Sequence, residues 1–172
     1  MSDSPRKDLV SPARREPGAH RTVLATIGYE GATVAGFLAA LKAAGVKLLV
    51  DVRAVASSRR PGFAKTRLAA NVNEVGIEYL HLRGLGTPAD GRAAARAGHH
   101  AEMRRIFLRH LARPESQFEL ATLADLVRTG PRPCLLCFEA DPAHCHRSMV
   151  ADALASLVPI ELHHLTPFDD SE

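Results

Sequence analysis

The fold class can be inferred from one segment, Cys134-Leu-Leu-Cys-Phe-Glu-Ala-Asp-Pro-Ala-His-Cys-His-Arg-Ser-Met-Val150. It begins as a short apolar run and ends with apolar residues at helical spacing. A buried parallel strand reads as a continuous apolar run, and a strand that turns directly into a helix is half of a β-α unit. In an open α/β sheet such a turn lies at the carboxyl edge, where ligands bind. The reactive side chains of this stretch therefore lie where such a fold places a site.

The same alternation of strand and helix continues along the chain. We expect strands over residues 23–28, 46–52, 77–82, 133–139 and 160–165, and helices over residues 34–44, 63–75, 99–111 and 115–129. Residues 89–98 are small and basic, which favours a loop or a loose helix acting as a mobile lid. The alternation predicts a parallel sheet of about five strands with helices on both faces.

The composition is typical of a single globular domain. The chain has 172 residues, of which 46% are hydrophobic and 24% charged. Residues 1–20 are polar and interrupted by proline, so we expect a disordered tail there and one domain over residues 21–168. No apolar run approaches the roughly 18 residues of a membrane span, and no secretory signal is visible. Three cysteines fit a reducing compartment, so we expect a cytoplasmic protein.

Charge is distributed unevenly along the chain. Residues 59–113 hold 11 Lys and Arg against 4 Asp and Glu, whereas residues 114–172 hold 3 against 10. Such asymmetry is typical of proteins that bind an anionic ligand, nucleic acid or a second copy of themselves, and also of solvated helix faces. The aromatic content of 5% and the absence of Trp count against a single-stranded nucleic-acid platform.

Asp51 and Arg53 end the second expected strand. Alternation places both side chains on the same side of the sheet, and a charge buried there needs a partner. The two residues therefore form either a structural ion pair or an anion-binding arginine held by its aspartate, at the edge where ligands bind. The turn-rich loop that follows, residues 57–63, carries Arg59 next to Arg60.

Cys134 and Cys137 have the CxxC spacing of zinc and redox sites. Positions three apart on a strand lie on opposite faces of the sheet, however. If residues 133–139 form a strand, these two thiols cannot hold one metal ion. We expect both to be small core residues.

Cys145 lies at or just before the start of a helix, where free amides and the helix dipole favour a thiolate. Two helix starts are compatible with the sequence. Asp141 as N-cap with Pro142 at the first position fits capping preferences and turns Cys145 away from the core face. A start near His146 leaves Cys145 in the loop, aimed at the crevice, and only this start suits a nucleophile.

Arg147 would complete an anion site with Arg53, because a guanidinium beside a helix N-terminus can reach the strand ends. The alternative is a salt bridge from Arg147 to Glu139 or Asp141. Cys145 and Arg147 are only two positions apart, too close for a phosphatase-type phosphate loop.

A metal site has only ligand type in its favour. The available ligands are Cys145, His146, His144, His81 and the pair His163-His164, and adjacent residues rarely bind one ion. We therefore expect no metal, and the sequence indicates no particular cofactor.

Six blocks of the chain carry a resemblance to a known family. They are Thr26-Ile-Gly-Tyr29, Leu49-Val-Asp-Val-Arg53, Ser58-Arg-Arg-Pro-Gly-Phe63, Gly76-Ile-Glu-Tyr-Leu-His-Leu82, Leu85-Gly-Thr-Pro88 and Cys137-Phe-Glu-Ala-Asp-Pro-Ala-His-Cys-His-Arg-Ser148. In this order they are similar to the motifs of the DUF488 family, a group of small, mostly bacterial and archaeal α/β proteins, over about residues 25–165. The Cys-His-Arg block is the most specific.

The resemblance implies a Rossmann-like three-layer sandwich with a mostly parallel sheet and a shared pocket, but no established reaction. One block departs from the family. Many relatives have Leu-Pro-x-Leu-Gly-Gly after the third strand, where this chain has Leu82-Arg-Gly-Leu-Gly-Thr87.

Two functional hypotheses follow. The first is an enzyme or an anion- or nucleotide-binding domain with a Cys-His-Arg pocket at the carboxyl edge of the sheet. Its candidate catalytic residues are Cys145 as nucleophile, His146 or His144 as base, and Glu139. Its candidate ligand-binding residues are Arg53, Arg147, Asp51, Tyr29, His81 and Arg59. The second is a nucleic-acid-associated module that uses the basic segment 59–113.

Overall fold

A computed structural model of the chain describes residues 21–169, which contain a five-stranded sheet. The strands are β1 Thr22–Gly28, β2 Leu48–Asp51, β3 Glu78–His81, β4 Pro133–Cys137 and β5 Ile160–Leu165. The helices are α1 Val34–Ala43, α2 Lys65–Glu74, α3 Ala89–Arg96, α4 His100–Leu111, α5 Pro114–Thr129 and α6 His146–Ala155. Two short 3-10 turns, Arg83–Leu85 and Pro142–His144, follow β3 and β4. The tail expected over residues 1–20 lies outside the described residues.

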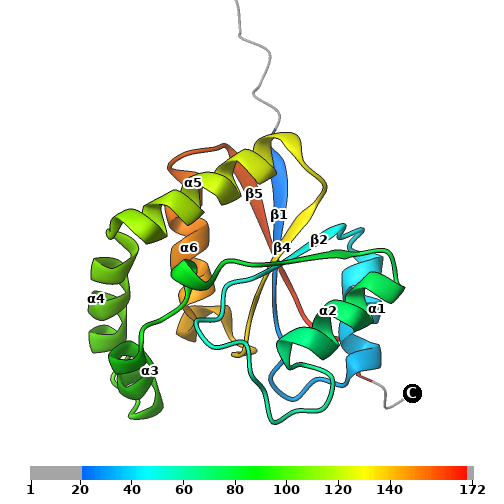
Figure 1. The fold of residues 1–172 in the computed structure, drawn as a ribbon, viewed down its shortest axis with the longest axis horizontal. Coiled ribbons are helices and arrows are strands. Elements are labelled where there is room, and N and C mark those ends of the chain that lie inside the picture. Colours follow the sequence, from blue (N-terminus) through cyan, green and yellow to red (C-terminus); the bar gives the residue numbers. More distant parts are fainter. Residues whose placement is uncertain (1–20, 170–172) are drawn as a thin grey trace, which may run out of the picture.

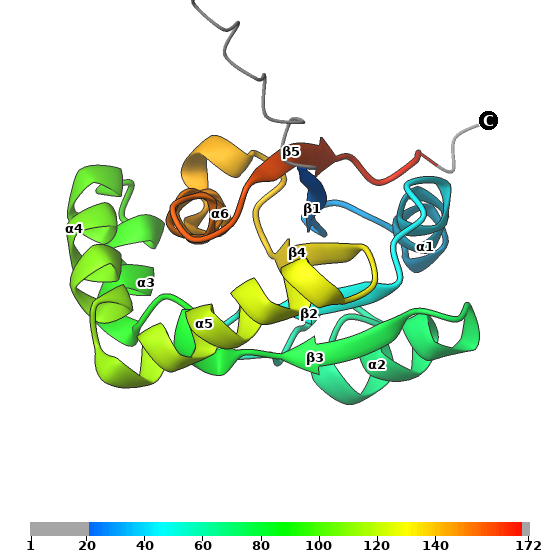
Figure 2. The same cartoon turned by 90° about the horizontal axis from the view of Figure 1, so that it is seen from above.

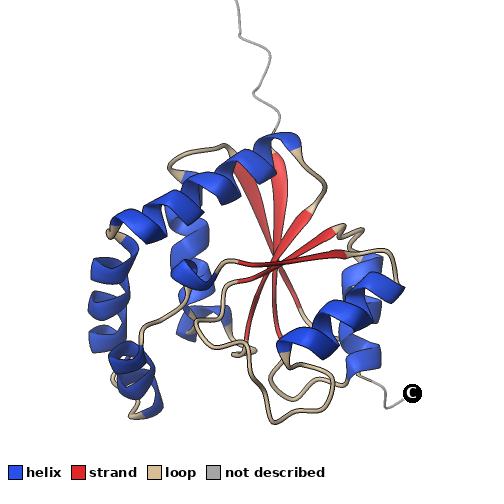
Figure 3. Ribbon diagram, in the orientation of Figure 1, coloured by secondary structure: helices blue, strands red, loops and turns tan. Residues whose placement is uncertain are grey.

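The elements form three layers, with the sheet in the middle (Figure 1). The strand order is β3-β2-β4-β1-β5, and every neighbouring pair is parallel. Figure 2 shows α1 and α2 on one face of the sheet and α3, α4, α5 and α6 on the other. Figure 3 shows the strands enclosed between these two groups of helices. The Rossmann-like three-layer fold expected from the sequence is confirmed, and the sheet is parallel throughout.

The direction of each crossover explains which face a helix covers. From β1 the chain moves through β2 to β3 at one edge, and from β3 it returns through β4 to β5 at the other edge. Because parallel crossovers are right-handed, the two directions place their helices on opposite faces. The exit of β4 therefore turns away from the exits of its neighbours β1 and β2, which opens a crevice at their carboxyl ends.

Strand alternation divides the core into two parts. Leu49 and Leu136 pack with α1 and α2, whereas Val50 and Leu135 pack with α3 to α6. Both faces of the central strands are therefore buried, which is why these strands read as unbroken apolar runs.

Of the two alternatives expected for residues 89–98, a loop or a loose helix, the structure has the helix, since most of this segment is α3. Its small residues Gly91 and Ala94 are buried, and a Cβ atom at Gly91 would lie 2.6 Å from the side chain of Thr87. The small side chains of α3 therefore allow this helix to pack closely against its neighbours. Among residues 21–169, no helix combines the length and the apolar character needed to cross a membrane.

Candidate functional site

The carboxyl ends of the four neighbouring strands β3, β2, β4 and β1 meet at one level of the sheet. Asp51 is in register with His81 on one side and Leu136 on the other, and Gly28 is in register with Cys137. The loops that follow these ends are in close contact. A Cβ atom at Gly28 would lie 1.8 Å from the Glu139 carbonyl oxygen. Glycine at this position therefore lets the exit of β4 lie against the end of β1.

Arg53 and Asp51 form a buried ion pair on the side of the sheet that faces α1 and α2. Nε and Nη2 of Arg53 donate to the two carboxylate oxygens of Asp51 at 2.8 and 2.6 Å. Nη1 donates to the Tyr29 hydroxyl at 3.1 Å and to the Phe63 carbonyl at 2.9 Å. Arg53 is 4% exposed and Asp51 is fully buried. The expectation that both side chains lie on one side of the sheet and are paired is confirmed.

Further contacts make this pair part of a closed network. Tyr79 donates to Asp51 at 2.5 Å, Nε2 of His81 bonds the Arg53 carbonyl at 2.7 Å, and the Tyr29 ring stacks on Phe63 at 4.6 Å. Burial acts to lower the pKa of Arg53, but the hydrogen bond and charge of Asp51 outweigh it and raise that pKa. Burial and the hydrogen bond to Asp51 raise the pKa of Tyr79. The geometry favours the structural ion pair over an arginine free to bind a ligand.

The junction between β4 and α6 uses both helix starts that the sequence allowed, one after the other. Asp141 caps the 3-10 turn, its Oδ1 accepting from the Ala143 amide at 2.9 Å. The helix α6 begins at His146, with Cys145 as its N-cap and the Cys145 Sγ accepting from the Arg147 amide at 3.5 Å. The later start is therefore the start of α6. Cys145 nevertheless does not face an open crevice, because it is only 3% exposed.

Cys145 contributes instead to a buried group that we call the thiol–imidazole cluster: Cys137, Cys145 and His146. Nδ1 of His146 lies 3.4 Å from the Cys137 Sγ and 3.9 Å from the Cys145 Sγ. Nε2 of His146 lies 2.8 Å from the Val52 carbonyl oxygen. Because a carbonyl only accepts, Nε2 carries a hydrogen, and in the neutral ring Nδ1 presents its lone pair to both sulfurs.

The surroundings of the cluster keep its thiols protonated. Burial raises the pKa of Cys137 and raises that of Cys145 well above its ordinary value. Burial acts to raise the pKa of Glu139, but the hydrogen bond from the Cys137 thiol at 3.0 Å outweighs it and lowers that pKa. The thiolate that a nucleophilic Cys145 requires is therefore disfavoured in the metal-free protein.

Both cysteines of the CxxC pair are buried, as expected, but Cys137 also meets Cys145 and His146. The two thiols do lie on opposite sides of β4, as alternation requires, and Cys134 packs with α1 and α2. Cys137 faces α6, where the thiols of Cys137 and Cys145 meet His146. The spacing within β4 excluded Cys134 as a partner of Cys137. It could not predict the contact of Cys137 with Cys145, because Cys145 lies at the start of the next helix.

Arg147 does not converge on a common site with Arg53. Its guanidinium is fully buried and donates to the carbonyl oxygens of Glu139 and Ala140 and to the Thr26 hydroxyl. The salt bridge to a carboxylate that the sequence also allowed is not formed either. Arg147 instead ties the β4–α6 loop to β1 and α6, and it lines neither cavity of the site.

Two adjoining cavities lie over the cluster. The smaller, of about 220 Å³, is lined by Tyr29, Arg53, Ala54, Val55, Ser57, Thr87, Arg92, Cys137, Phe138, Glu139 and His146. The larger, of about 390 Å³, is lined by Thr87, Arg92, Ala95, Arg96, His100, Met103, Phe138, Glu139, His144 and His146. Because Arg92, Phe138, Glu139 and His146 border both, the cavities form one cleft between α3 and the exit of β4.

The cleft contains two arginines that sequence reasoning missed, Arg92 and Arg96 of α3. Their spacing of four places them on one helix face, so the helical alternative expected for residues 89–98 contained the signal that could have found them. Arg59, which was expected to bind a ligand, is exposed and lines neither cavity. His81 lies outside the cleft, in a shallow depression with Ser57 and Arg83.

One comparison with known proteins identifies the chain. A family model described as "Domain of unknown function DUF488" matches residues 33–154. The match runs from α1 nearly to the end of α6 and includes Arg53 and the thiol–imidazole cluster, but it leaves out β1 and β5, which the expected span of 25–165 included. No significant match was found among curated proteins or solved structures. The chain belongs to the DUF488 family.

Proposed function

We propose that the protein binds a small anionic molecule, bearing a phosphate or a carboxylate, in the cleft at the carboxyl edge of the sheet. The observation that carries the proposal is the pair of arginines, Arg92 and Arg96, that α3 contributes to the cleft wall. In this proposal, Arg92 and Arg96 bind the anion, which is the role that the sequence had suggested for Arg53 and Arg147.

The charges around the cleft support an anion. Within residues 21–169, the guanidinium of Arg96 makes no hydrogen bond or ion pair, and that of Arg92 donates only to the Thr87 carbonyl, at 2.9 Å. Glu139 is the single acidic residue among the described residues that line the two cavities. Guanidinium groups without carboxylate partners attract anions and bind them with charge-assisted hydrogen bonds.

The size and lining of the cleft suit a small molecule. A volume of about 390 Å³ falls within the range of about 300–1,000 Å³ typical of ligand sites. Phe138 is 42% exposed at the rim and offers an aromatic face for a nucleobase or another flat group. His146 and Glu139 border both cavities and would contact the ligand, whereas Cys145 lies behind them. If a reaction follows binding, Glu139 is its candidate general acid or base, because both ring nitrogens of His146 are engaged with Val52 and the two thiols.

The test is calorimetric titration of the full chain with inorganic phosphate, AMP and succinate as separate probes. We expect at least one probe to bind at one site per chain. Arg96→Ala should weaken that binding about 10- to 100-fold, since a hydrogen bond to a charged group contributes about 1.5–3 kcal/mol.

Arg104→Ala is the matched control, because Arg104 is also exposed on a nearby helix but lines neither cavity. This variant removes the same charge and should bind as the unmodified chain does. Absence of binding with all three probes, or equal affinities for the Arg96→Ala and Arg104→Ala variants, would contradict the proposal.

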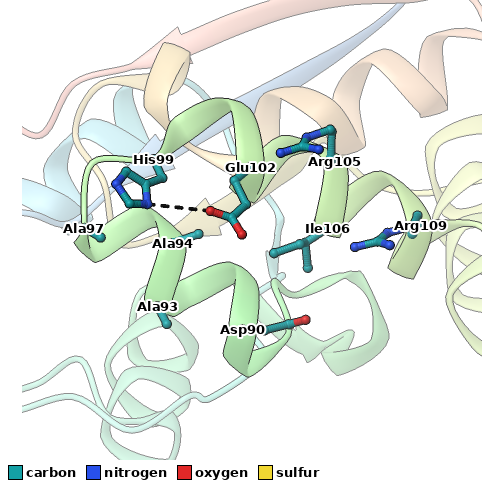
Figure 4. Close-up of a pocket in the computed structure, with 9 residues that line it drawn as sticks. All are labelled: Asp90, Ala93, Ala94, Ala97, His99, Glu102, Arg105, Ile106 and Arg109. Carbon is teal, nitrogen blue, oxygen red and sulfur yellow. Dashed lines mark ion pairs between the residues drawn. The ribbon is translucent and has the colours of Figure 1, made fainter.

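A second candidate, nucleic-acid association, is favoured by a narrower observation than the sequence suggested. The fold divides the basic segment 59–113, since α2 lies on one face of the sheet and α3 and α4 on the other (Figure 2). Figure 4 shows that Arg105 and Arg109 of α4 line a groove beside α3. Arg113 follows at the same spacing of four. Asp90 and Glu102 line the same groove, and they reduce its attraction for a polyanion.

Fluorescence anisotropy with labelled duplex DNA and single-stranded RNA tests this candidate. If these three arginines contact phosphates of duplex DNA, the logarithm of the association constant should fall with the logarithm of salt concentration at a slope of about −2.7, or about −0.9 per contact. Arg105→Ala/Arg109→Ala should abolish most of that dependence. Binding that is absent, or that does not depend on salt, removes the candidate.

A further inference from the structure

We propose that Cys137, Cys145 and His146 form a zinc-binding site. The inference concerns the interior of the site, beneath the cleft, and it stands whether or not an anion binds above. Its basis is the convergence of two thiols and one imidazole nitrogen, all within 4.8 Å of one another, from the end of β4 and the start of α6.

The spacing of the three donor atoms matches tetrahedral zinc. With Zn–S bonds of about 2.3 Å and Zn–N bonds of about 2.0–2.1 Å, a tetrahedral site places sulfur and nitrogen about 3.5 Å apart and its two sulfurs about 3.8 Å apart. The observed distances from His146 Nδ1 are 3.4 Å to the Cys137 Sγ and 3.9 Å to the Cys145 Sγ. Both sulfur–nitrogen distances are therefore close to the tetrahedral value, and because the three donor atoms lie within 4.8 Å of one another, the two sulfurs need to approach by at most about 1 Å to bind one ion.

The imidazole is already oriented as a metal ligand. Its Nε2 is held by the Val52 carbonyl at 2.8 Å, so its free lone pair is on Nδ1, the nitrogen that faces the thiols. A ligating histidine in a metal site almost always donates its other ring N–H to a carbonyl or carboxylate in this way. Cys145 is held by its position as N-cap of α6.

Zinc also removes a weakness of the metal-free cluster. A thiol is a weak donor and a weak acceptor, so the contacts among these three groups provide little compensation for burying them. On binding zinc, each thiol loses its proton to solvent, and two thiolates then balance the charge of the ion. The product is a neutral group, which suits an interior where an unpaired charge would be unfavourable. Two thiolates with one imidazole favour zinc over magnesium or calcium, which prefer oxygen ligands.

Three protein ligands leave a fourth coordination position. Cys137 and His146 also line the cavity of about 220 Å³, so an ion held between them borders the cleft. Glu139 lines the same cavity, and its Oε2 lies 3.0 Å from the Cys137 Sγ. A zinc site with three protein ligands and one position open to a cavity is the arrangement of catalytic zinc, whereas structural zinc is enclosed by four.

The experiment uses the full chain, reduced and stripped of metal with a chelator, and titrated with zinc against a chromophoric chelator. We expect one zinc ion per chain. Cys137→Ser, Cys145→Ser and His146→Gln should each lower the affinity by more than about 100-fold, because loss of an outer-shell partner alone typically lowers it about 10- to 100-fold.

Two controls separate this site from others. Cys134→Ala removes a buried thiol on the opposite side of β4, and His144→Gln removes an exposed histidine one residue before Cys145. Both variants should keep the affinity of the unmodified chain. Arg96→Ala, which tests the anion site, should keep it too.

Cobalt substitution of the unmodified chain makes the test independent of how well any variant folds. Co²⁺ bound by thiolates produces a sulfur-to-metal charge-transfer absorption, which we expect at one equivalent. Absence of this absorption would overturn the proposal. Zinc binding that survives in the Cys137→Ser/Cys145→Ser variant, or that disappears in His144→Gln, would overturn it as well.

Discussion

Two groups of buried polar side chains lie at the same edge of the sheet, and they differ in how completely they are paired. On the α1–α2 side, Arg53 and Asp51 are joined by two hydrogen bonds between their side chains and are further bonded by Tyr29, Phe63 and Tyr79. On the α6 side, the thiol–imidazole cluster is held by the contact of His146 with the Val52 carbonyl, by the hydrogen bond from the Cys137 thiol to Glu139, and by weak contacts between sulfur and nitrogen.

The difference supports our proposal that the first group is structural and the second binds a ligand. A buried charge is tolerated when its partners satisfy it, and the network around Arg53 does so with protein groups alone. The cluster satisfies its members poorly but aims three donor atoms at one point. The conspicuous arginine in the sequence therefore stabilises the fold, while the less conspicuous Cys137 belongs to the site.

The largest effect should follow from breaking the Arg53 network. Arg53→Met leaves the Asp51 carboxylate buried without its counter-ion, and we expect the free energy of unfolding to fall by about 3–5 kcal/mol. Urea unfolding followed by circular dichroism measures the difference.

The double variant Asp51→Asn/Arg53→Met is the control for that measurement. Because it removes both charges, it should lose less stability than the sum of the two single variants. Additive losses, or a loss below about 1 kcal/mol for Arg53→Met, the size seen for exposed pairs, would contradict the structural assignment of the pair.

A smaller effect should follow from removing Arg147, which lies between the two groups. Arg147→Ala leaves the carbonyls of Glu139 and Ala140 without their donor, and we expect a loss of about 1–3 kcal/mol. Arg147→Lys should recover only part of it, because an ammonium cannot reproduce the planar fork of a guanidinium. Equal stability of the Lys variant and the unmodified chain would show that charge alone matters here.

The smallest predicted change in the free energy of unfolding is an increase. Cys145 is the N-cap of α6, and Ser is among the preferred N-cap residues. In the metal-free chain, Cys145→Ser should therefore raise the free energy of unfolding by up to about 1 kcal/mol, although the same variant should lose zinc.

Cys134→Ser is the comparison for that prediction. It places a hydroxyl in the apolar core and should lower stability by about 1–3 kcal/mol. If the metal-free Cys145→Ser variant is destabilised as strongly, then Cys145 is retained for packing, and the comparison between the two groups of side chains fails.

Much of the fold could be predicted because its signals are local. The last strand was expected at residues 160–165 and is Ile160–Leu165, and the helix expected at 115–129 is Pro114–Thr129. Apolar runs and helical periodicity reflect burial of one stretch at a time, so they can be read without knowing its neighbours. Segment 89–98 was left between a loop and a loose helix because Gly and Ala give a weak periodic signal, whereas in α3 these small residues allow close packing.

For the candidate site, the sequence could predict the location but not which way each side chain points. Parallel strands end at one edge, and this placed Asp51, Arg53, Glu139, Cys145 and His146 in the correct region. The direction of each side chain there depends on the exit loop and on which helix covers which face. Arg147 was therefore assigned to the pocket although it is bonded to backbone carbonyls, and Arg92 and Arg96 were overlooked.

The Cys134–Val150 stretch shows which features follow from the sequence and which depend on the tertiary structure. The sequence shows that this stretch is a strand followed by a helix. It also shows that Cys134 and Cys137 lie on opposite faces of the sheet, because side chains alternate along a strand whatever its neighbouring strands are. Only the tertiary structure decided that α6 covers the face of Cys137 and begins at His146. Those two facts depend on strand order and on the capping of one loop, and together they bring two thiols and one imidazole to a single point.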